Sequence, residues 1–425
     1  MKNEIICYLV FSIILLLISY YLIFFKFNNL NQFDEKFDEK FDVIAFSKIN
    51  QNNRNQLKWS RNKCNYIMNE TILNELKANG IYESQTDWNL LFPCSYDNIQ
   101  SEVNMMPIIK GAKYFILENC DNIVAKELLW KYVVDHYDYP IAKTMMPNSY
   151  ILYDKSDIDR FTKEHDDKKI YIMKKNIQRQ EGLKITKDKN EILDGFKNGG
   201  YVIVQELLQN PYTISKRKTN MRFYILVVCK ENDMNVFVYK DGFMYYTKDE
   251  FTIGSIDEGP NITTGYIDRS VYETNPLTHS DLKVYLDDPN RELSQIEKSI
   301  KNQGLKISEI YFNRIYHLIR QIFTAVYGQL TKSNKFDKTN TMFQLFGADI
   351  AVDNKLNPTI MEINKGPDLG AKDQRDLELK KGVVRNMLKV IGTLQSNSCN
   401  DTMYLKVLDI TNGIINNDNK NNCSL

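Results

Sequence analysis

The stretch that decides the fold reads MFQLFGADIAVDNKLNPTIMEIN and spans residues 342–364. Two apolar runs flank the polar connector 353–358, whose Asp, Asn and Pro residues are typical of a hairpin loop. Folding one run back on the other predicts two paired strands, with Asp349 close to Glu362. Residues two apart in a strand point to the same face, so Asn364 is expected beside Glu362.

These oxygen-bearing side chains suit a magnesium site. Two carboxylates and one amide oxygen on a buried face form a hard-oxygen cage, which Mg²⁺ prefers and Zn²⁺ does not. Magnesium held in this way usually carries nucleotide phosphates. The alternative is a core hairpin whose carboxylates form salt bridges. The three residues together favour the metal site, because Asp and Glu in apolar strands are seldom buried without a partner or a metal.

Length, charge and cysteine content restrict the class of protein. A chain of 425 residues with a net charge of +1 suits one large globular unit or two to three small ones. A net charge near zero argues against a nucleic-acid partner, which would require a basic excess. The seven cysteines are scattered without a CxxC pair, which predicts reduced thiols and a cytosolic catalytic part. The four histidines form no HExxH motif, so zinc hydrolase chemistry is unsupported.

The N-terminus carries a second strong signal, because residues 5–25 are almost entirely apolar. As a helix this segment would be about 31 Å long, which matches a bilayer core of roughly 30 Å. It predicts a single-pass membrane anchor, and the alternative is a buried helix of a soluble protein. Basic residues slightly favour the segment's C-terminal side, so the catalytic part is expected in the cytosol.

Other segments carry basic side chains suited to phosphate. Lys174 lies near the end of the predicted strand 171–175, and a lysine in this position can reach a phosphate as a point charge. The polar loop that follows holds Gly182 and can close over phosphates through its N–H groups. Lys218 and Arg222 are four residues apart and lie on one face if the segment is extended. Each signal is weak alone, since strand-edge lysines and basic turns are usually solvated.

The order of these motifs resembles the tubulin–tyrosine ligase-like family, within the ATP-grasp superfamily. FQLFGxD followed by ExN is similar to the family's magnesium signature, and KRKTNMRFY (216–224) is similar to its RKFDIR segment. TDWNLLFP (86–93) and DNIVAKELLW (121–130) resemble further family segments. The resemblance covers roughly residues 85 to 390.

The resemblance implies an α/β (α+β) architecture, an ATP-grasp fold with N-terminal, central and C-terminal lobes, preceded by one transmembrane helix. The boundaries that we expect are a transmembrane helix over 5–25, a flexible tether over 26–58, an N-terminal lobe over 59–155, a central lobe over 156–210, a C-terminal lobe with the magnesium site over 211–395, and a disordered tail over 396–425. The tail is assigned from its lack of hydrophobic periodicity.

The resemblance also implies roles for individual residues. The implied nucleotide site consists of Lys126, Lys174, Gln205, Glu206, Leu208, Lys218, Arg222 and Thr263. The implied metal ligands are Asp349, Glu362 and Asn364, and the implied catalytic residues are Arg222, Glu362 and Lys218. The implied cofactors are ATP and Mg²⁺.

The reaction implied is an ATP-dependent ligation, in which a carboxylate is phosphorylated and an amine then forms an amide bond. The amino acid is left open between Tyr, Glu and Gly, and the acceptor is tubulin or another protein. Three departures from the family pattern, Asn220, Tyr245 and Thr264, favour an alternative. That alternative is a non-catalytic, membrane-tethered protein that binds nucleotide or microtubules. A ligase acting on a peptide other than tubulin is a further alternative.

Overall fold

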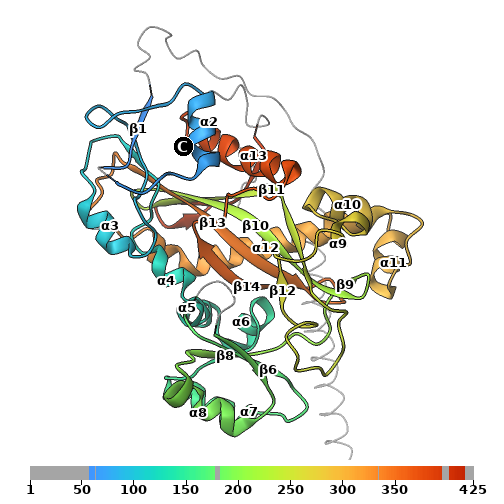
Figure 1. The fold of residues 1–425 in the computed structure, drawn as a ribbon. Coiled ribbons are helices and arrows are strands. Elements are labelled where there is room, and N and C mark those ends of the chain that lie inside the picture. The colour runs from blue at the N-terminus through green and yellow to red at the C-terminus, as the bar shows by residue number, and fades with distance from the viewer. Residues whose placement is uncertain (1–56, 63, 178–181, 334, 395–401, 417–425) are drawn as a thin grey trace, which may run out of the picture. The chain divides into compact units, whose positions relative to one another are not determined.

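The computed structural model describes residues 57–62, 64–177, 182–333, 335–394 and 402–416, all within one compact unit, residues 55–425. The predicted membrane anchor, residues 5–25, lies outside these ranges. Within them, no helix is both long enough and apolar enough to cross a bilayer. The architecture is mixed α/β, with a large sheet and a small sheet (Figure 1).

The large sheet has twelve strands and carries most of the core. Its main path, in order, is β16 (Ile414–Ile415), β15 (Tyr404–Thr411), β11 (Asp233–Thr247), β10 (Arg217–Lys230), β13 (Thr341–Val352), β4 (Lys113–Tyr114), β3 (Leu90–Leu91), β1 (Lys58–Ser60) and β2 (Tyr82–Glu83). Three strands pair outside this path, namely β9 (Thr213–Ile214), β12 (Thr263–Thr264) and β14 (Pro358–Lys365).

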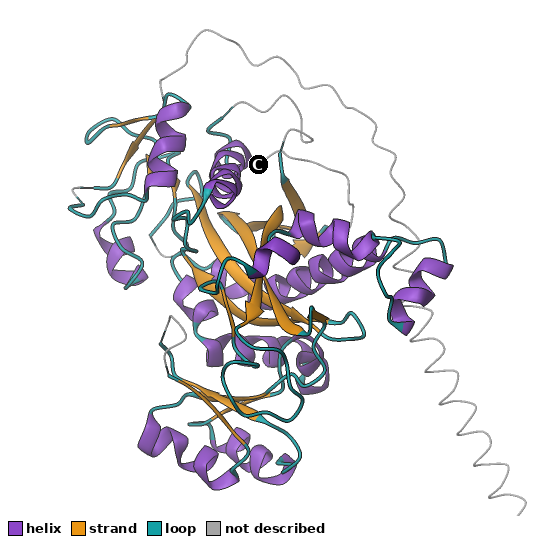
Figure 2. Ribbon diagram, turned by 45° about the vertical axis from the view of Figure 1, so that its right-hand side comes forward, coloured by secondary structure: helices purple, strands orange, loops and turns teal. Residues whose placement is uncertain are grey.

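Residues of β10 alternate between two hydrophobic clusters, as expected for a strand buried on both faces. Phe223 and Val227 belong to the cluster with helix α12 (Ile307–Leu330), whereas Leu226 belongs to the cluster with helix α13 (Gln374–Val390). The two helices therefore cover opposite faces of the sheet (Figures 1 and 2). Helix α12 turns an apolar stripe toward the core, and the members of this stripe are all buried: Ile310, Ile315, Leu318, Ile319 and Ile322.

The small sheet has the order β5 (Ser149–Ile151), β8 (Ile203–Glu206), β6 (Tyr171–Lys174) and β7 (Leu183–Thr186). Helices α7 (Lys155–Glu164) and α8 (Lys189–Gly199) lie along one of its faces (Figure 1). Phe161 of α7 and Ile192 of α8 pack on Tyr171 of β6 and Val204 of β8 in a separate hydrophobic cluster.

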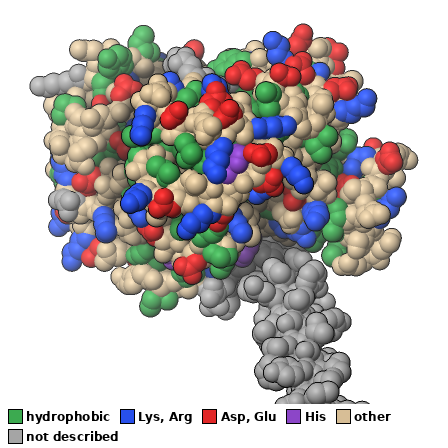
Figure 3. Space-filling model, turned by 90° about the horizontal axis from the view of Figure 1, so that it is seen from below, with side chains coloured by type: hydrophobic (Ala, Val, Ile, Leu, Met, Phe, Trp, Pro, Cys, Tyr) green, Lys and Arg blue, Asp and Glu red, His purple; other side chains and the backbone are tan. Residues whose placement is uncertain are grey.

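The remaining helices are short and lie before or between the strands. They are α2 (Glu70–Ala78), α3 (Ile99–Met105), α4 (Cys120–Val124), α5 (Lys126–Tyr137), α6 (Tyr139–Met145), α9 (Val271–Thr274), α10 (His279–Asp287) and α11 (Gln295–Asn302). On the face drawn in Figure 3, basic and acidic side chains are interspersed.

The predicted hairpin 342–364 is confirmed as β13 and β14. Asp353 closes the connector, because its Oδ1 atom accepts hydrogen bonds from the N–H groups of Lys355 and Asn357, both at 2.8 Å. Asp349 faces Glu362 across the strands, and the register shifts directly after this pair. The bulge increases the local twist at the position where the two carboxylates meet.

The tail prediction is wrong for residues 404–411. These residues form β15, which pairs antiparallel with β11 and buries Tyr404, Leu408 and Ile410. The strand is stabilised by pairing with β11, which is distant in sequence, so local composition does not reveal it.

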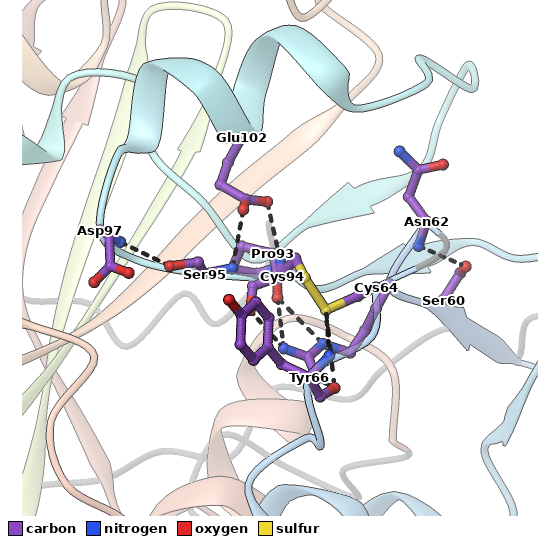
Figure 4. The surroundings of a disulfide bond; sticks show 10 residues. Ser60, Asn62, Cys64, Tyr66, Pro93, Cys94, Ser95, Asp97 and Glu102 are labelled. Atoms are coloured by element: carbon purple, nitrogen blue, oxygen red, sulfur yellow. Dashed lines mark hydrogen bonds between the residues drawn. A yellow bond between two sulfur atoms is a disulfide. The ribbon is translucent and has the colours of Figure 1, made fainter.

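The prediction of reduced thiols is wrong for one pair. Cys64 and Cys94 form a disulfide with a Cα–Cα distance of 5.3 Å (Figure 4). They meet because β1 and β3 are parallel neighbours, so the segments after these strands emerge side by side. Cys120 and Cys229 are buried free thiols. Disulfides are rare in cytosolic proteins, so cysteine content no longer supports a cytosolic catalytic part.

Candidate active site

The three predicted metal ligands lie on one face of the large sheet. Glu362 is the cross-strand neighbour of Asp349, and Asn364 donates from Nδ2 to Glu362 Oε1 at 2.9 Å. Arg222 on β10 faces Asp349 from the other side of β13. Its Nε and Nη2 atoms donate to Asp349 Oδ1 and Oδ2 at 2.6 and 3.0 Å. Three adjacent strands therefore bring two carboxylates, one amide and one guanidinium together.

The two carboxyl groups have different protonation tendencies. Burial raises the pKa of Asp349, although the Arg222 guanidinium opposes this shift. Burial also acts to raise the pKa of Glu362, but the charges of Lys126 and Lys174 outweigh it, so this pKa is lowered. Lys126 Nζ lies 3.8 Å from Glu362 Oε2. The Glu362 side chain remains 30% exposed, so a ligand can reach it.

Two buried lysines complete the cationic side of the site. Lys174 ends β6 and is 7% exposed, and Lys218 lies on β10 and is 3% exposed. Burial lowers the pKa of each amine to about 8. The charges of Glu362 and Asp349 act on Lys174, so the small sheet contributes to the same electrostatic environment as the large sheet.

Gln205 and Leu208, two residues of the implied nucleotide site, lie at the end of β8 and just after it. Gln205 is buried, and its Nε2 atom donates to Ser149 Oγ at 2.9 Å while Oε1 has no hydrogen-bond partner. The carbonyl oxygen of Leu208 accepts from Lys218 Nζ at 3.2 Å. Gln205 therefore offers a buried acceptor atom, and Leu208 lies directly beside a cationic residue of the site.

Glu206 and Thr263, the other two residues of the implied nucleotide site near β8 and β12, make contacts with residues outside the carboxylate pair. The Glu206 carboxylate accepts from Lys169 Nζ and from Asn148 Nδ2, both at 2.7 Å, so its side chain is already engaged. Thr263 of β12 pairs with Thr247, whose hydroxyl accepts from the Lys218 backbone N–H at 3.1 Å. Thr263 thus pairs with β11, one strand away from Lys218 on β10.

Residues that the motif comparison marked as unusual border the site. The ring of Tyr245 lies with its centroid 5.3 Å from the Arg222 guanidinium carbon, a cation–π arrangement. Buried Asn220 Oδ1 has no hydrogen-bond partner. The sequence analysis did not identify Lys365, which directly follows Asn364. Its ammonium group pairs with the Asp121 carboxylate. Its position next to the ExN motif was the only sequence feature that could have pointed to Lys365. The ion pair itself could not be predicted, because Asp121 is far away in sequence.

The chemistry of the donor set fits magnesium. Among the described residues, no group of three or more His, Cys, Asp or Glu side chains could hold a metal. The predicted trio contains only two carboxylates, and its third member is an amide. Asn364 uses its nitrogen toward Glu362, which leaves the carbonyl oxygen Oδ1 as a donor to a cation. Oxygen atoms alone are the ligands that magnesium prefers.

Two sheets that meet at one cluster of lysines and carboxylates are consistent with an ATP-grasp type of fold. The sequence model of the tubulin-tyrosine ligase family matches residues 110–399, which is more than half of the chain. The chain belongs to the tubulin-tyrosine ligase family. The resemblance inferred from the motifs is therefore confirmed.

Individual relatives agree with this assignment. The chain is 28% identical to probable tubulin polyglutamylase ttll-9 of Caenorhabditis elegans over 66% of this chain and 64% of the relative. It is 30% identical to probable tubulin polyglutamylase TTLL9 of Mus musculus over 44% of this chain and 38% of the relative. Tubulin glycylase 3B of Drosophila melanogaster is 23% identical over 54% of this chain and 30% of the relative. The matches span less than two thirds of each relative's length.

Proposed function

We propose that this protein is an ATP-dependent carboxylate–amine ligase that joins an amino acid to a protein acceptor such as tubulin. The observation that carries the proposal is the paired Asp349 and Glu362. Lys126 at the start of α5, Lys174 on the small sheet and Arg222 on the large sheet surround this pair. Names of the relatives support tubulin as the acceptor and favour glutamate or glycine over tyrosine as the amino acid.

Asp349, Glu362 and Asn364 would hold magnesium. The ion would neutralise charge on the nucleotide phosphates and orient the γ-phosphoryl group. Arg222 fixes the orientation of Asp349 through two hydrogen bonds, and Asn364 fixes Glu362 through one. The donors are thus held in place by neighbouring side chains, which reduces reorganisation when a ligand binds.

The lysines would bind the triphosphate. Lys126 and Lys174 converge on Glu362, and Lys218 lies where β8 ends. A protonated amine in a buried site attracts phosphate oxygens more strongly than one in water, because the effective dielectric constant is lower. Gln205 Oε1 and the backbone near Leu208 would contact the adenine. Catalysis would then rest on positioning and charge stabilisation, without a side-chain nucleophile.

The test is turnover of the full chain with Mg-ATP, purified tubulin and labelled Tyr, Glu and Gly. We expect label in tubulin, and we expect Glu362→Gln to abolish it while the variant stays folded, because the neutral amide is a weaker magnesium ligand. Glu378→Gln, on an exposed part of α13, is the matched control. Full turnover in the Glu362→Gln variant would remove the metal assignment.

A second candidate is a non-catalytic protein that binds nucleotide or microtubules. Tyr245 favours it, because its ring covers one side of Arg222, and Asn220 leaves a buried oxygen without a partner. ATP binding without ADP release and without label in any acceptor would support this candidate. ADP release without labelled tubulin would instead point to a ligase with a different acceptor.

Membrane attachment through residues 5–25 remains part of the proposal, on the strength of the apolar sequence alone. We expect the full chain to resist alkaline carbonate extraction from membranes and a chain lacking residues 5–25 to be released. Equal extraction of both forms would remove the anchor. The three ATP-grasp lobes are proposed with the boundaries predicted above, with the correction at residues 404–411.

A further inference from the structure

We propose that the Cys64–Cys94 disulfide, acting through Tyr96, positions the end of β14 that carries Asn364, so that magnesium-dependent ATP binding depends on thiol redox state. The inference rests on the proposed ATP and magnesium site. The segment that contains the disulfide lies before residue 110, outside the region matched by the family model.

The disulfide joins two segments that are otherwise separated by thirty residues. On the Cys94 side, the Glu102 carboxylate accepts from the backbone N–H groups of Cys94 and Ser95 at 2.9 and 3.0 Å (Figure 4). On the Cys64 side, Arg61 Nη2 donates to the carbonyl oxygens of Cys94 and Pro93 at 2.8 and 3.2 Å. These contacts set the path by which the chain leaves Cys94.

Tyr96, two residues after Cys94, lies beside Gly366, the residue that directly follows β14. Its ring would lie 3.2 Å from a Cβ atom at Gly366, which has a φ of +63°. It also packs edge-on against Phe115, with ring centroids 6.2 Å apart. Gly366 is two residues after Asn364. A shift of the Tyr96 ring would therefore act on the backbone that presents the Asn364 amide.

A second contact connects the same region to β14. Lys365 pairs with Asp121, and Asp121 Oδ2 accepts from the Ile99 backbone N–H at 3.3 Å. Ile99 begins α3, which follows the Tyr96 loop. The end of β14 thus lies beside Tyr96 of the loop, and its Lys365 pairs with Asp121 of α4, which in turn accepts a hydrogen bond from the start of α3.

The disulfide is the two-state element that this coupling requires. Cys64 and Cys94 are both partly exposed, so a small thiol can reach them, whereas Cys120 and Cys229 are fully buried. Oxidation would use a small-molecule disulfide such as oxidised glutathione. One cysteine thiolate attacks it and releases one glutathione thiolate. The other cysteine thiolate then displaces the second glutathione, so two cysteine thiols are oxidised and one glutathione disulfide is reduced.

The experiment measures the ATP dissociation constant of the full chain with Mg²⁺ and with EDTA, before and after reduction by dithiothreitol. Mass spectrometry of unreduced peptides establishes the state of the pair. We expect reduction to weaken Mg-ATP binding by about fivefold, within the range of coupling through packed contacts, and to change Mg-free binding by less than about twofold. A merely structural role would not separate these two constants.

Variants of Cys64 and Tyr96 test whether the disulfide acts on the ATP site through the Tyr96 ring. Cys64→Ser should bind as the reduced protein does and should not respond to dithiothreitol, which controls for other effects of the reductant. Tyr96→Ala should show the same weak binding in both redox states, and Tyr96→Phe should restore the response because it keeps the ring. If the cysteine variants fail to fold, the reduced wild-type protein and the Tyr96 pair still decide the outcome.

Two results would overturn the inference. One is an equal Mg-ATP affinity in the oxidised and reduced wild-type protein, and the other is a pair that stays reduced with oxidised glutathione. Failure of the proposed function looks different, because the protein would then bind no ATP in either redox state.

Discussion

Lys174→Met should make the ligand-free protein more stable while it weakens ATP binding. Lys174 is 7% exposed, and burial lowers its pKa from 10.5 to about 8. A lowered lysine pKa means that the unfolded chain binds the proton more tightly than the folded protein does. The charged amine therefore destabilises the fold below pH 8, and this penalty disappears as the pH rises toward 10.5.

The size of the effect follows from these two pKa values. At pH 7 the penalty is about 3 kcal/mol, and at pH 9.5 it is about half of that. Methionine has a similar length and no charge, so it should recover most of this free energy. Lys175→Met is the matched control, because Lys175 is the partly exposed neighbour, and we expect it to change stability little.

The assay is urea unfolding without nucleotide at pH 7, 8.5 and 9.5, together with ATP titration at pH 7. We expect the stability gain of Lys174→Met to shrink as pH rises and the ATP dissociation constant to increase. A variant that is less stable than wild type at pH 7, or a gain that is independent of pH, would show that Lys174 is not held at an electrostatic cost.

Other perturbations test neighbouring parts of the site and the fold. Arg222→Gln should lose about 3 to 5 kcal/mol of stability in chemical denaturation, because it leaves Asp349 buried without its partner; an unchanged midpoint would contradict the ion pair. ATP affinity of the wild-type protein should fall as the pH rises from 7 to 9, because Lys174 and Lys218 lose their charge around pH 8; a flat calorimetric profile would contradict this. Cys64→Ser should lower the free energy of unfolding by about 3 to 4 kcal/mol, as expected for a closed loop of this length; equal stability under oxidising conditions would contradict the disulfide.

Local patterns were sufficient to predict the hairpin that carries the site. The two apolar runs and the loop composition of 342–364 placed Asp349 beside Glu362, and the spacing of two placed Asn364 on the same face. The apolar stripe of α12 can also be recognised in the sequence, because a helix of 24 residues repeats its hydrophobic pattern several times. Both features depend on residues that are close together in sequence, within one hairpin or one helix.

Features that depend on distant pairing were not predictable. Cys64 meets Cys94 only because β1 and β3 are adjacent in the sheet, and this pairing cannot be predicted from the spacing of the cysteines. β15 forms within an Asn-rich region because β11 offers it an edge. The motif comparison named Lys126 as a nucleotide contact, but its approach to Glu362 depends on how α5 packs against the neighbouring helices α4, α6 and α12.

The balance of charge in the site indicates the order in which ligands bind. Four cationic side chains meet two carboxylates here, namely Lys126, Lys174, Lys218 and Arg222 against Asp349 and Glu362. Magnesium alone would add positive charge to a site that already has an excess of it, whereas a triphosphate would supply the missing negative charge.

We therefore expect millimolar Mg²⁺ alone to leave the thermal unfolding midpoint unchanged and Mg-ATP to raise it, since a ligand stabilises the state that binds it. The magnesium-free nucleotide should produce a smaller rise. A shift by Mg²⁺ alone as large as that by Mg-ATP would mean that the carboxylates, and not the lysines, dominate the electrostatics of the site.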